Sequence, residues 1–358
     1  MADIEVDYDA LNYLSGSLHG LKDTVPKAMT YSSSHAELKV SGGDMALYLA
    51  IADTAKKVED ALSKWLVDTA TACRAGAEAV EDCVIFYQQH EERVVAEFHG
   101  VYTESDAAGA HAGASSVAAA KLTPPVNDVV FDDVFDAMGL MGNVISPSFW
   151  LGTFTDWVLD AILGAGEHDP FKAIGDLIAG DWEKISLASD ALSKLGDYYT
   201  CLEEELRERV LKIDADWNGG ASDAAQHSLK KTADSFGEVA EKLSGLSKDY
   251  NTVAIGVFQT ADVLTGLLRS LADWGIAAAI AAAAGTATAE TVVGAIAGWG
   301  VAGWSVWKML NIVEEIFSAL DLTWQIASVF SGQCALWLGD YHSGGRTATI
   351  HIPAFVEE

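Results

Sequence analysis

Residues 185–253 read ISLASDALSKLGDYYTCLEEELRERVLKIDADWNGGASDAAQHSLKKTADSFGEVAEKLSGLSKDYNTV, and this stretch decides the fold. Apolar residues recur at spacings of three and four on both sides of Trp217-Asn218-Gly219, which places them on one face of a helix. Before the tripeptide they are Ile185, Ala188, Leu192, Leu195, Tyr199, Leu202, Leu206, Val210 and Ile213; after it they are Leu229, Phe236, Val239, Leu243, Leu246, Tyr250 and Val253. The pattern predicts two long helices, charged on much of the opposite face, that pack antiparallel.

The tripeptide itself predicts the turn between these helices. Gly219 and Gly220 allow the positive φ that ends a helix, and Ser222 before Asp223 is the expected N-cap of the second helix. The indole of Trp217 is expected to cap the seam where the two arms diverge. On the plainer interpretation, this ring does nothing more than fill the turn.

A second hairpin is predicted at the N-terminus. Leu11, Leu14, Leu18, Leu21 and Val25 form an apolar stripe, which a polar loop holding Ser32, Ser33, Ser34 and Ser41-Gly42-Gly43 is expected to follow. A very long helix then starts at Asp44 and continues to about residue 100, since no proline interrupts it. Its apolar face runs through Val58, Leu62, Trp65, Thr69, Cys73, Gly76, Val80, Val84 and Tyr87. Gly76 is the one interior position where a break or bend is expected, because glycine costs about 1 kcal/mol relative to alanine inside a helix.

These patterns predict an all-α fold in which antiparallel helical hairpins form a long four-helix bundle, joined to an apolar Ala/Gly-rich helical hairpin. The expected units are an N-terminal hairpin over 1–106 and a mobile Ala/Gly/Ser/Pro linker over 107–127. Amphipathic helices and the Trp217 hairpin follow over 128–262, the apolar hairpin over 263–333, and a tail over 334–358. Residues 347–352 of that tail alternate weakly, like a short strand.

The apolar hairpin is the second unusual feature, because Glu290 is the only ionisable residue between Trp274 and Trp307. The two apolar runs on either side of Glu290 are each shorter than the ~20 residues that cross a bilayer as one helix. Gly294 and Gly298 form a GxxxG pair, with Gly303 near the same face, and such a pair permits close helix packing in protein or in lipid. Insertion into a membrane and burial in a soluble core both remain open.

Composition excludes several function classes. A formal charge of -30 over 358 residues repels phosphate backbones, so no nucleic-acid partner is expected. The acidic start MADIEVDYDA lacks the basic and apolar regions of a Sec signal peptide, so any export must use another route. Cys73, Cys83, Cys201 and Cys334 have neither CxxC nor metal-finger spacing.

Two motifs with known chemistry match this sequence at least in part, but neither has both the structural context and the full residue set that its chemistry needs. Residues 298–303 match GxGxxG, but no strand precedes them to place a pyrophosphate. His90-Glu91 begins an HExxH motif whose second histidine is replaced by Val94. No GxSxG or P-loop is present, and the nine histidines lack ligand spacing. We therefore expect no enzyme, no catalytic residue, no cofactor and no metal site.

The Trp217-Asn218-Gly219 hairpin resembles the WXG family of type VII secretion substrates from actinobacteria and related Gram-positive bacteria. Tyr102-Thr103-Glu104-Ser105-Asp106 is similar to the YxxxD export motif of those systems. Residues 169–183, the hairpin after them and the Ala-rich hairpin resemble the N-terminal channel-type domains of large type VII toxins, which extends the resemblance to about residue 330. Such toxins usually carry an enzymatic domain next, whereas only about 25 residues follow Gln333 here.

The resemblance implies a non-enzymatic type VII substrate, secreted or at the cell surface and exported as a folded bundle. Trp217 and Gly219 would shape one part of a composite signal, and Tyr102 and Asp106 would be read by the secretion ATPase. It implies a homo-oligomer or a WXG-type chain as further partners, and a membrane if Glu290, Gly294, Gly298 and Gly303 belong to an inserting hairpin. The alternatives are a soluble helical scaffold or binding module whose apolar hairpin is core, and a cytosolic helical protein whose WxG turn arose by chance.

Overall fold

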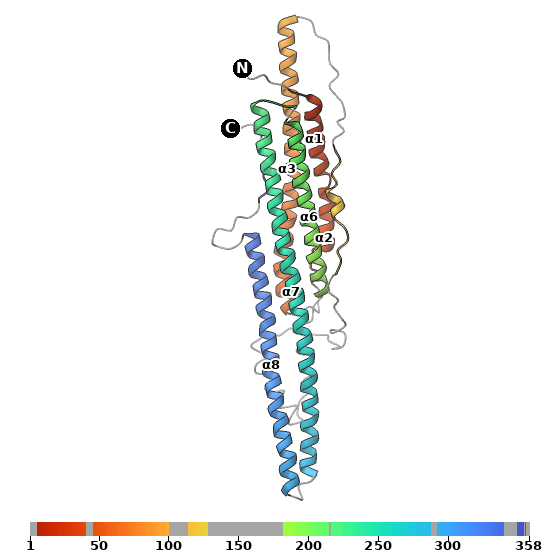
Figure 1. Ribbon diagram of the computed structural model, residues 1–358, viewed down its shortest axis with the longest axis vertical. Coiled ribbons are helices and arrows are strands. Elements are labelled where there is room, and N and C mark those ends of the chain that lie inside the picture. The colour runs from red at the N-terminus through yellow and green to blue at the C-terminus, as the bar shows by residue number, and fades with distance from the viewer. Residues whose placement is uncertain are drawn as a thin grey trace.

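The computed structural model describes residues 6–40, 46–99, 114–127, 182–214, 216–287, 292–339, 349–353 and 355. Over these ranges the chain is all-α, with α1 (Tyr8–Lys22), α2 (Val25–His35), α3 (Ala46–His99), the short 3-10 helix η1 (Ala118–Lys121), α6 (Trp182–Ile213), α7 (Gly220–Ala287) and α8 (Val292–Leu338). The helices form a long, narrow rod (Figure 1). The predicted fold class is confirmed.

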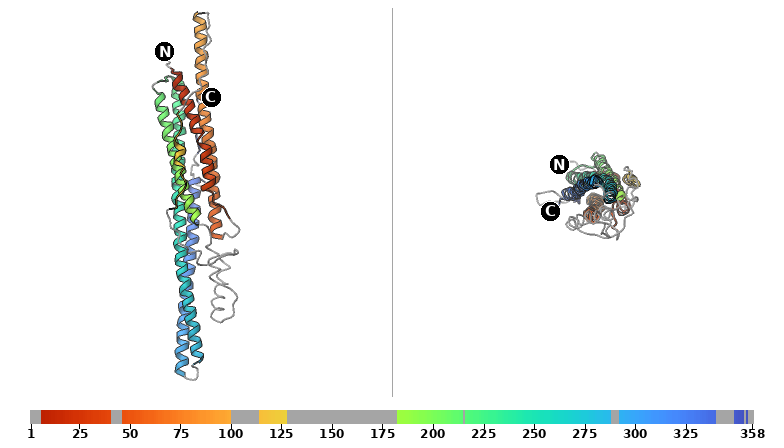
Figure 2. Two further views of the ribbon diagram at one scale, coloured as in Figure 1. Left: turned by 90° about the vertical axis from the view of Figure 1, so that its right-hand side faces the viewer. Right: turned by 90° about the horizontal axis from the view of Figure 1, so that it is seen from below.

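Four segments make the bundle at one half of the rod. The pair α1 and α2 counts as one segment and runs antiparallel to α3, with which it forms the first hairpin. The other two segments, α6 and α7, form the second hairpin (Figures 1 and 2). The predicted apolar faces are the core: the nine positions of α6 and the seven of α7 are all at most 1% exposed. In the other half of the rod α7 continues beyond the ends of the other described helices and packs with α8, which returns antiparallel beside it (Figure 1).

The first arm differs from its prediction, because it is two helices rather than one helix and a polar loop. α1 ends at Lys22, and Pro26 lies in the first turn of α2, where its missing N–H and fixed φ suit a helix start. Ser32, Ser33 and Ser34 therefore lie within α2 and not in a loop. At the corner, the Thr24 hydroxyl lies 2.9 Å from the Tyr198 hydroxyl of α6, which fixes the break against the bundle.

α3 runs through Gly76 as one helix, so no break occurs where a bend was expected. The glycine serves close packing instead. A Cβ at this position would lie 3.2 Å from Pro353 Cγ, 3.3 Å from Leu229 Cδ2 and 3.4 Å from Leu18 Cδ1. Three separate segments thus meet α3 at its one interior residue without a side chain.

Residues 114–127, expected to be part of a mobile linker, pack along α1, α2 and α6; we call them the first strap. Helix side chains bind its backbone: Glu205 and Asp190 accept from the Val117 and Val126 amides at 2.8 and 2.7 Å, and Tyr31 donates to the Thr123 carbonyl at 2.8 Å. Burial raises the pKa of Tyr31 to about 12, so its hydroxyl stays protonated as a donor at neutral pH.

One ion pair of α6 is also inside the molecule, although its residues looked like part of a charged outer face. Arg209 donates to Glu205 at 2.7 Å, and the two side chains are only 6% and 13% exposed. Arg209 also reaches the Ser17 carbonyl at 3.4 Å, while Glu205 holds the first strap. Because both charges find several partners, they link α1, α6 and the strap at the cost of desolvation.

The expected helices between 128 and 181 lie outside the described residues. Within the described residues, no helix contains a stretch long and apolar enough to cross a membrane.

Two leucines of α6 test the role of the buried face. Leu206→Ala should lower the free energy of unfolding by about 2–5 kcal/mol, because Leu206 is fully buried and its truncation leaves a cavity. Leu211→Ala should change it by at most about 0.5 kcal/mol, since that side chain is 65% exposed. Urea unfolding followed by circular dichroism measures both; equal midpoints would contradict the assigned face.

Candidate functional site

The turn between α6 and α7 is built by backbone hydrogen bonds around Trp217. The Asp216 and Trp217 amides donate to the Ile213 carbonyl at 3.1 and 3.0 Å, which closes α6. Gly219 has φ 123°, a conformation that favours glycine, and α7 starts directly after it at Gly220. Gly219 and Gly220 were predicted to end the first helix, but α6 already ends at Ile213; Gly219 instead precedes the start of α7, and Gly220 is the first residue of that helix.

Ser222 is not the N-cap that the sequence suggested, because it already lies inside α7. Its hydroxyl donates to the Trp217 carbonyl at 2.7 Å and accepts from Gln226 Nε2 at 3.3 Å. Ser222 thus ties α7 back to the turn.

Trp217 is completely buried and joins three segments. Its indole N–H donates to the Tyr87 hydroxyl of α3 at 3.3 Å, and its backbone forms an antiparallel bridge with Val6. Next to this bridge the Asp7 amide donates to the Asp216 carbonyl at 2.9 Å, while the Asp7 carboxylate caps α1 by accepting from the Asp9 amide at 2.8 Å. The turn is therefore an anchor for α1 and α3, and its indole has no surface to offer a partner.

Val6, Asp7 and Tyr87 are the members of this anchor that the sequence pattern did not assign to it. Tyr87 belonged to the predicted apolar face of α3, and it begins the YxxxE sequence that ends at Glu91. Its contact with Trp217 makes that tyrosine a packing residue. Nothing in the local sequence links position 87 to position 217, since the two meet only when the hairpins pack together.

Tyr102 and Asp106 lie outside the described residues. The helix that precedes them is described: α3 passes Trp217 at Tyr87 and continues to His99, which is about 18 Å further at the helical rise. Figure 1 shows this end of α3 projecting beyond the turn at the same end of the rod. The chain therefore enters residues 100–106 from the end that carries the buried turn.

The apolar-hairpin residues are placed only in part. Gly294, Gly298 and Gly303 lie in the backbone of α8, while Glu290 lies between α7 and α8, outside the described residues. Beyond the three glycines along α8, Trp304 and Trp307 are 53% and 49% exposed, with ring centroids 5.0 Å apart. Lys308 Nζ lies 5.3 Å from each ring centroid. This aromatic and cationic group lies on the described surface of α8.

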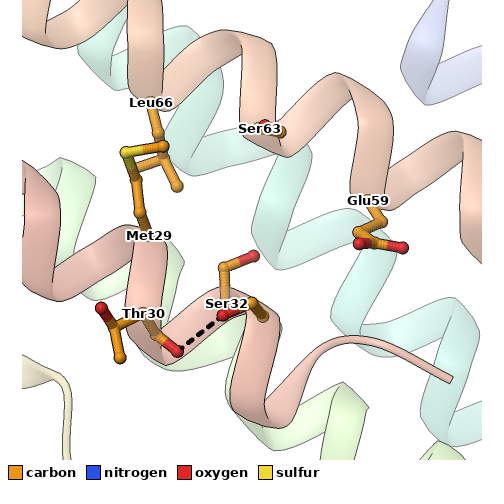
Figure 3. Close-up of a pocket in the computed structure, with 7 residues that line it drawn as sticks. Met29, Thr30, Ser32, Glu59, Ser63 and Leu66 are labelled. Atoms are coloured by element: carbon orange, nitrogen blue, oxygen red, sulfur yellow. Dashed lines mark hydrogen bonds between the residues drawn. The ribbon is translucent and has the colours of Figure 1, made fainter. Parts of the chain in front are cut away.

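A pocket of about 300 Å³ lies between α2 and α3 (Figure 3). The described residues that line it are Met29, Thr30, Ser32, Ser33, Glu59, Ser63 and Leu66. Its hydrogen-bonding groups are already engaged in part, because Ser33 donates to the Thr30 carbonyl at 3.1 Å and Lys56 to Glu59 at 3.0 Å. The lining combines one carboxylate, Glu59, with several hydroxyl groups.

Three of the four cysteines are poorly suited to act as nucleophiles. Cys73, Cys201 and Cys334 are buried thiols, and burial raises the pKa of Cys73 to about 12 and that of Cys201 to about 11. A thiol with so high a pKa holds little of the reactive thiolate at neutral pH. Among the described residues, no group of three His, Cys, Asp or Glu side chains is placed to hold a metal ion.

Two tryptophans test the anchor. Trp217→Ala should lower the free energy of unfolding by about 3–5 kcal/mol, because it empties a fully buried site. It should also speed hydrogen exchange at the Asp7 amide, which the turn holds. Trp307→Ala is the matched control and should change stability by at most about 0.5 kcal/mol, since this side chain is half exposed. Unchanged exchange at Asp7 in Trp217→Ala would refute the anchor.

Comparisons with protein-family models, with curated proteins and with solved structures found no match to this chain. The geometry of the turn and of the rod is therefore the basis for assigning a function.

Proposed function

We propose that this chain is a non-enzymatic substrate of a type VII secretion system, exported as a folded helical bundle. The observation that carries the proposal is the contact between Trp217 and Tyr87, because it joins the WxG turn to the helix that leads to Tyr102 and Asp106. A composite signal needs both parts at one end of the molecule, and this contact supports such an arrangement within a single polypeptide.

The two parts of the signal have different tasks in this proposal. Trp217 and Gly219 position α3 from inside the bundle. Tyr102 and Asp106 are read by the secretion ATPase, with the phenol as an aromatic anchor and the carboxylate as a charge. The protein is then secreted or surface-located through the type VII route, and the second hairpin supplies in cis what a WXG-type partner chain would supply in trans.

Export assays of variants test this proposal. Tyr102→Ala and Asp106→Asn should abolish the protein in culture filtrate while its level inside the cell is maintained, because they remove the recognised groups and leave the described core intact. Asp53→Asn is the matched control, since its carboxylate is 75% exposed on α3 near the opposite end of that helix, and it should be exported normally. Quantitative immunoblots of both fractions measure this.

Wild-type amounts of Tyr102→Ala and Asp106→Asn outside the cell would exclude the signal. Loss of Asp53→Asn from the filtrate would show that export depends on surface charge in general.

A second activity is favoured by the tryptophans of the distal hairpin: binding to a lipid surface after export. Trp274 on α7 and the pair Trp304 and Trp307 on α8 lie at similar distances, about 20 Å, from the ends of their helices at the hairpin tip. Tryptophan at one level, with Lys308 beside it, is typical of side chains at a membrane interface. Between Trp274 and Trp307 Glu290 is the only ionisable residue, although the chain as a whole has a net charge of -30.

The soluble alternative has support of its own, because the hairpin holds a separate small core. Ala261, Leu264 and Leu271 of α7 are buried together with Met309, Ile312 and Ile316 of α8. This cluster lies between the tryptophan level and the bundle, so it stabilises the hairpin whether or not the tip meets lipid.

Flotation with phosphatidylcholine vesicles separates the two. The wild-type chain should float with the vesicles, and the double variant Trp304→Ala, Trp307→Ala should lose most of this binding because both rings are exposed. The control, Leu322→Ala with Val329→Ala, removes similarly exposed apolar groups elsewhere on α8 and should float like wild type. A wild-type chain that stays with the protein fraction would favour the soluble scaffold.

A further inference from the structure

Residues 349–353 and Phe355, which we call the second strap, lie along α3 and α7 beyond the end of α8. α8 packs on the same two helices: Thr54 of α3 donates to Ser331 at 3.2 Å, and the Trp337 indole donates to Asp249 of α7 at 2.7 Å. The second strap then contacts α7 at Ser228–Ser235, further toward the buried turn, so it follows the line of α8 with an extended chain.

Three hydroxyl groups of α7 hold one residue of the strap. Ser228, Thr232 and Ser235 are spaced by four and three residues, which places them on one helix face, and all are at most 6% exposed. Ser235 Oγ accepts from the His351 amide at 3.1 Å, and the Thr232 hydroxyl shares its one proton between the His351 carbonyl oxygen at 3.0 Å and the Ser228 carbonyl oxygen of its own helix at 3.2 Å. The imidazole Nε2 of His351 lies 3.1 Å from Ser228 Oγ. Both backbone groups and the ring of His351 are therefore recognised.

α3 supplies the other wall of this site. The absence of a side chain at Gly76 leaves room for Pro353, whose Cγ lies 3.2 Å from where a Cβ would be. Ile350 is 7% exposed and Pro353 is buried, whereas Ile352 is 48% exposed and faces outward. The site thus takes an apolar residue, a histidine held through its backbone, a free position and a proline.

We propose that Gly76, Ser228, Thr232 and Ser235 form a peptide-binding slot for an extended segment of the pattern apolar-His-x-Pro, and that residues 350–353 of the chain are its exchangeable occupant. Recognition through backbone groups resembles the addition of a strand to a sheet edge, where main-chain hydrogen bonds give affinity and pockets for alternate side chains give selectivity. This assignment does not depend on the proposed export.

The tether decides which peptide fills the slot. A free peptide that is held by a few hydrogen bonds, each contributing about 0.5–1.5 kcal/mol, binds weakly. A segment joined to the same chain has an effective concentration of about millimolar, so it excludes a free competitor. Cutting the chain between α8 and the strap should remove this advantage and make the slot available to an added peptide.

The test uses the full chain with a specific protease site inserted between Ser343 and Gly344, and a fluorescent synthetic peptide spanning residues 347–356. Fluorescence anisotropy should show little binding to the uncut chain and saturable binding after cleavage. Thr232→Val in the cut chain should weaken binding about five-fold, as expected for one lost hydrogen bond. Thr252→Val is the matched control, since the Thr252 hydroxyl is exposed and donates to the Lys248 carbonyl of its own helix at 2.8 Å.

Changes in the peptide keep the test valid if Thr232→Val disturbs α7. Peptides with His351→Pro, which removes the amide donor, or Pro353→Asp should bind more weakly than the native peptide, whereas Ile352→Ser should bind equally because that side chain faces outward. No binding to the cut chain, or equal binding of all four peptides, would overturn the proposal. Equal loss for Thr232→Val and Thr252→Val would also count against the slot.

Discussion

Burial of the apolar face of α6 is the constraint on which the rest of the structure depends. This face meets α1, α2, α7 and the first strap, and it buries side chains that each contribute roughly 1.5–3 kcal/mol when they leave water. At its centre Tyr198 and Tyr199 lie edge to face, and their hydroxyls lie 2.9 Å from Thr24 Oγ1 and 3.1 Å from Thr69 Oγ1. Burial raises the pKa of both phenols, so each remains a neutral hydrogen-bonding group within the core. The hydroxyl partners fix the level at which the two hairpins meet.

The sequence predicts the parts of this fold that depend on one helix at a time. The apolar faces of α6 and α7 follow from spacing alone, and the turn follows from Gly219, whose positive φ suits glycine better than any other residue. The composition of residues 114–127 predicts a mobile linker. In the structure the same small residues and prolines form a strap whose peptide groups are bound by helix side chains. Arg209 and Glu205 have the i,i+4 spacing that is typical of a solvent-exposed ion pair. They are buried because α1, at Ser17, and the first strap, at Val117, pack against them.

The candidate site also has a part that the sequence predicts and a part that it does not. Trp217 and Gly219 stand where the sequence predicts a turn, but the contacts that give the turn its role come from Val6, Asp7 and Tyr87, on two other segments. Such contacts depend on how the hairpins pack, which no local spacing contains. The slot on α7 shows the same limit: Ser228, Thr232 and Ser235 look like polar interruptions of an apolar helix until an extended segment lies across them.

α7 has a mechanical consequence, because it passes without a break from the buried turn into the distal hairpin. At about 1.5 Å per residue it is roughly 100 Å long, and it contributes side chains to both the large and the small core. It contains no proline, and helices without such interruptions curve gently rather than fold back. A force on the distal hairpin is therefore transmitted along one continuous helix to Gly220, directly after the turn that holds Trp217.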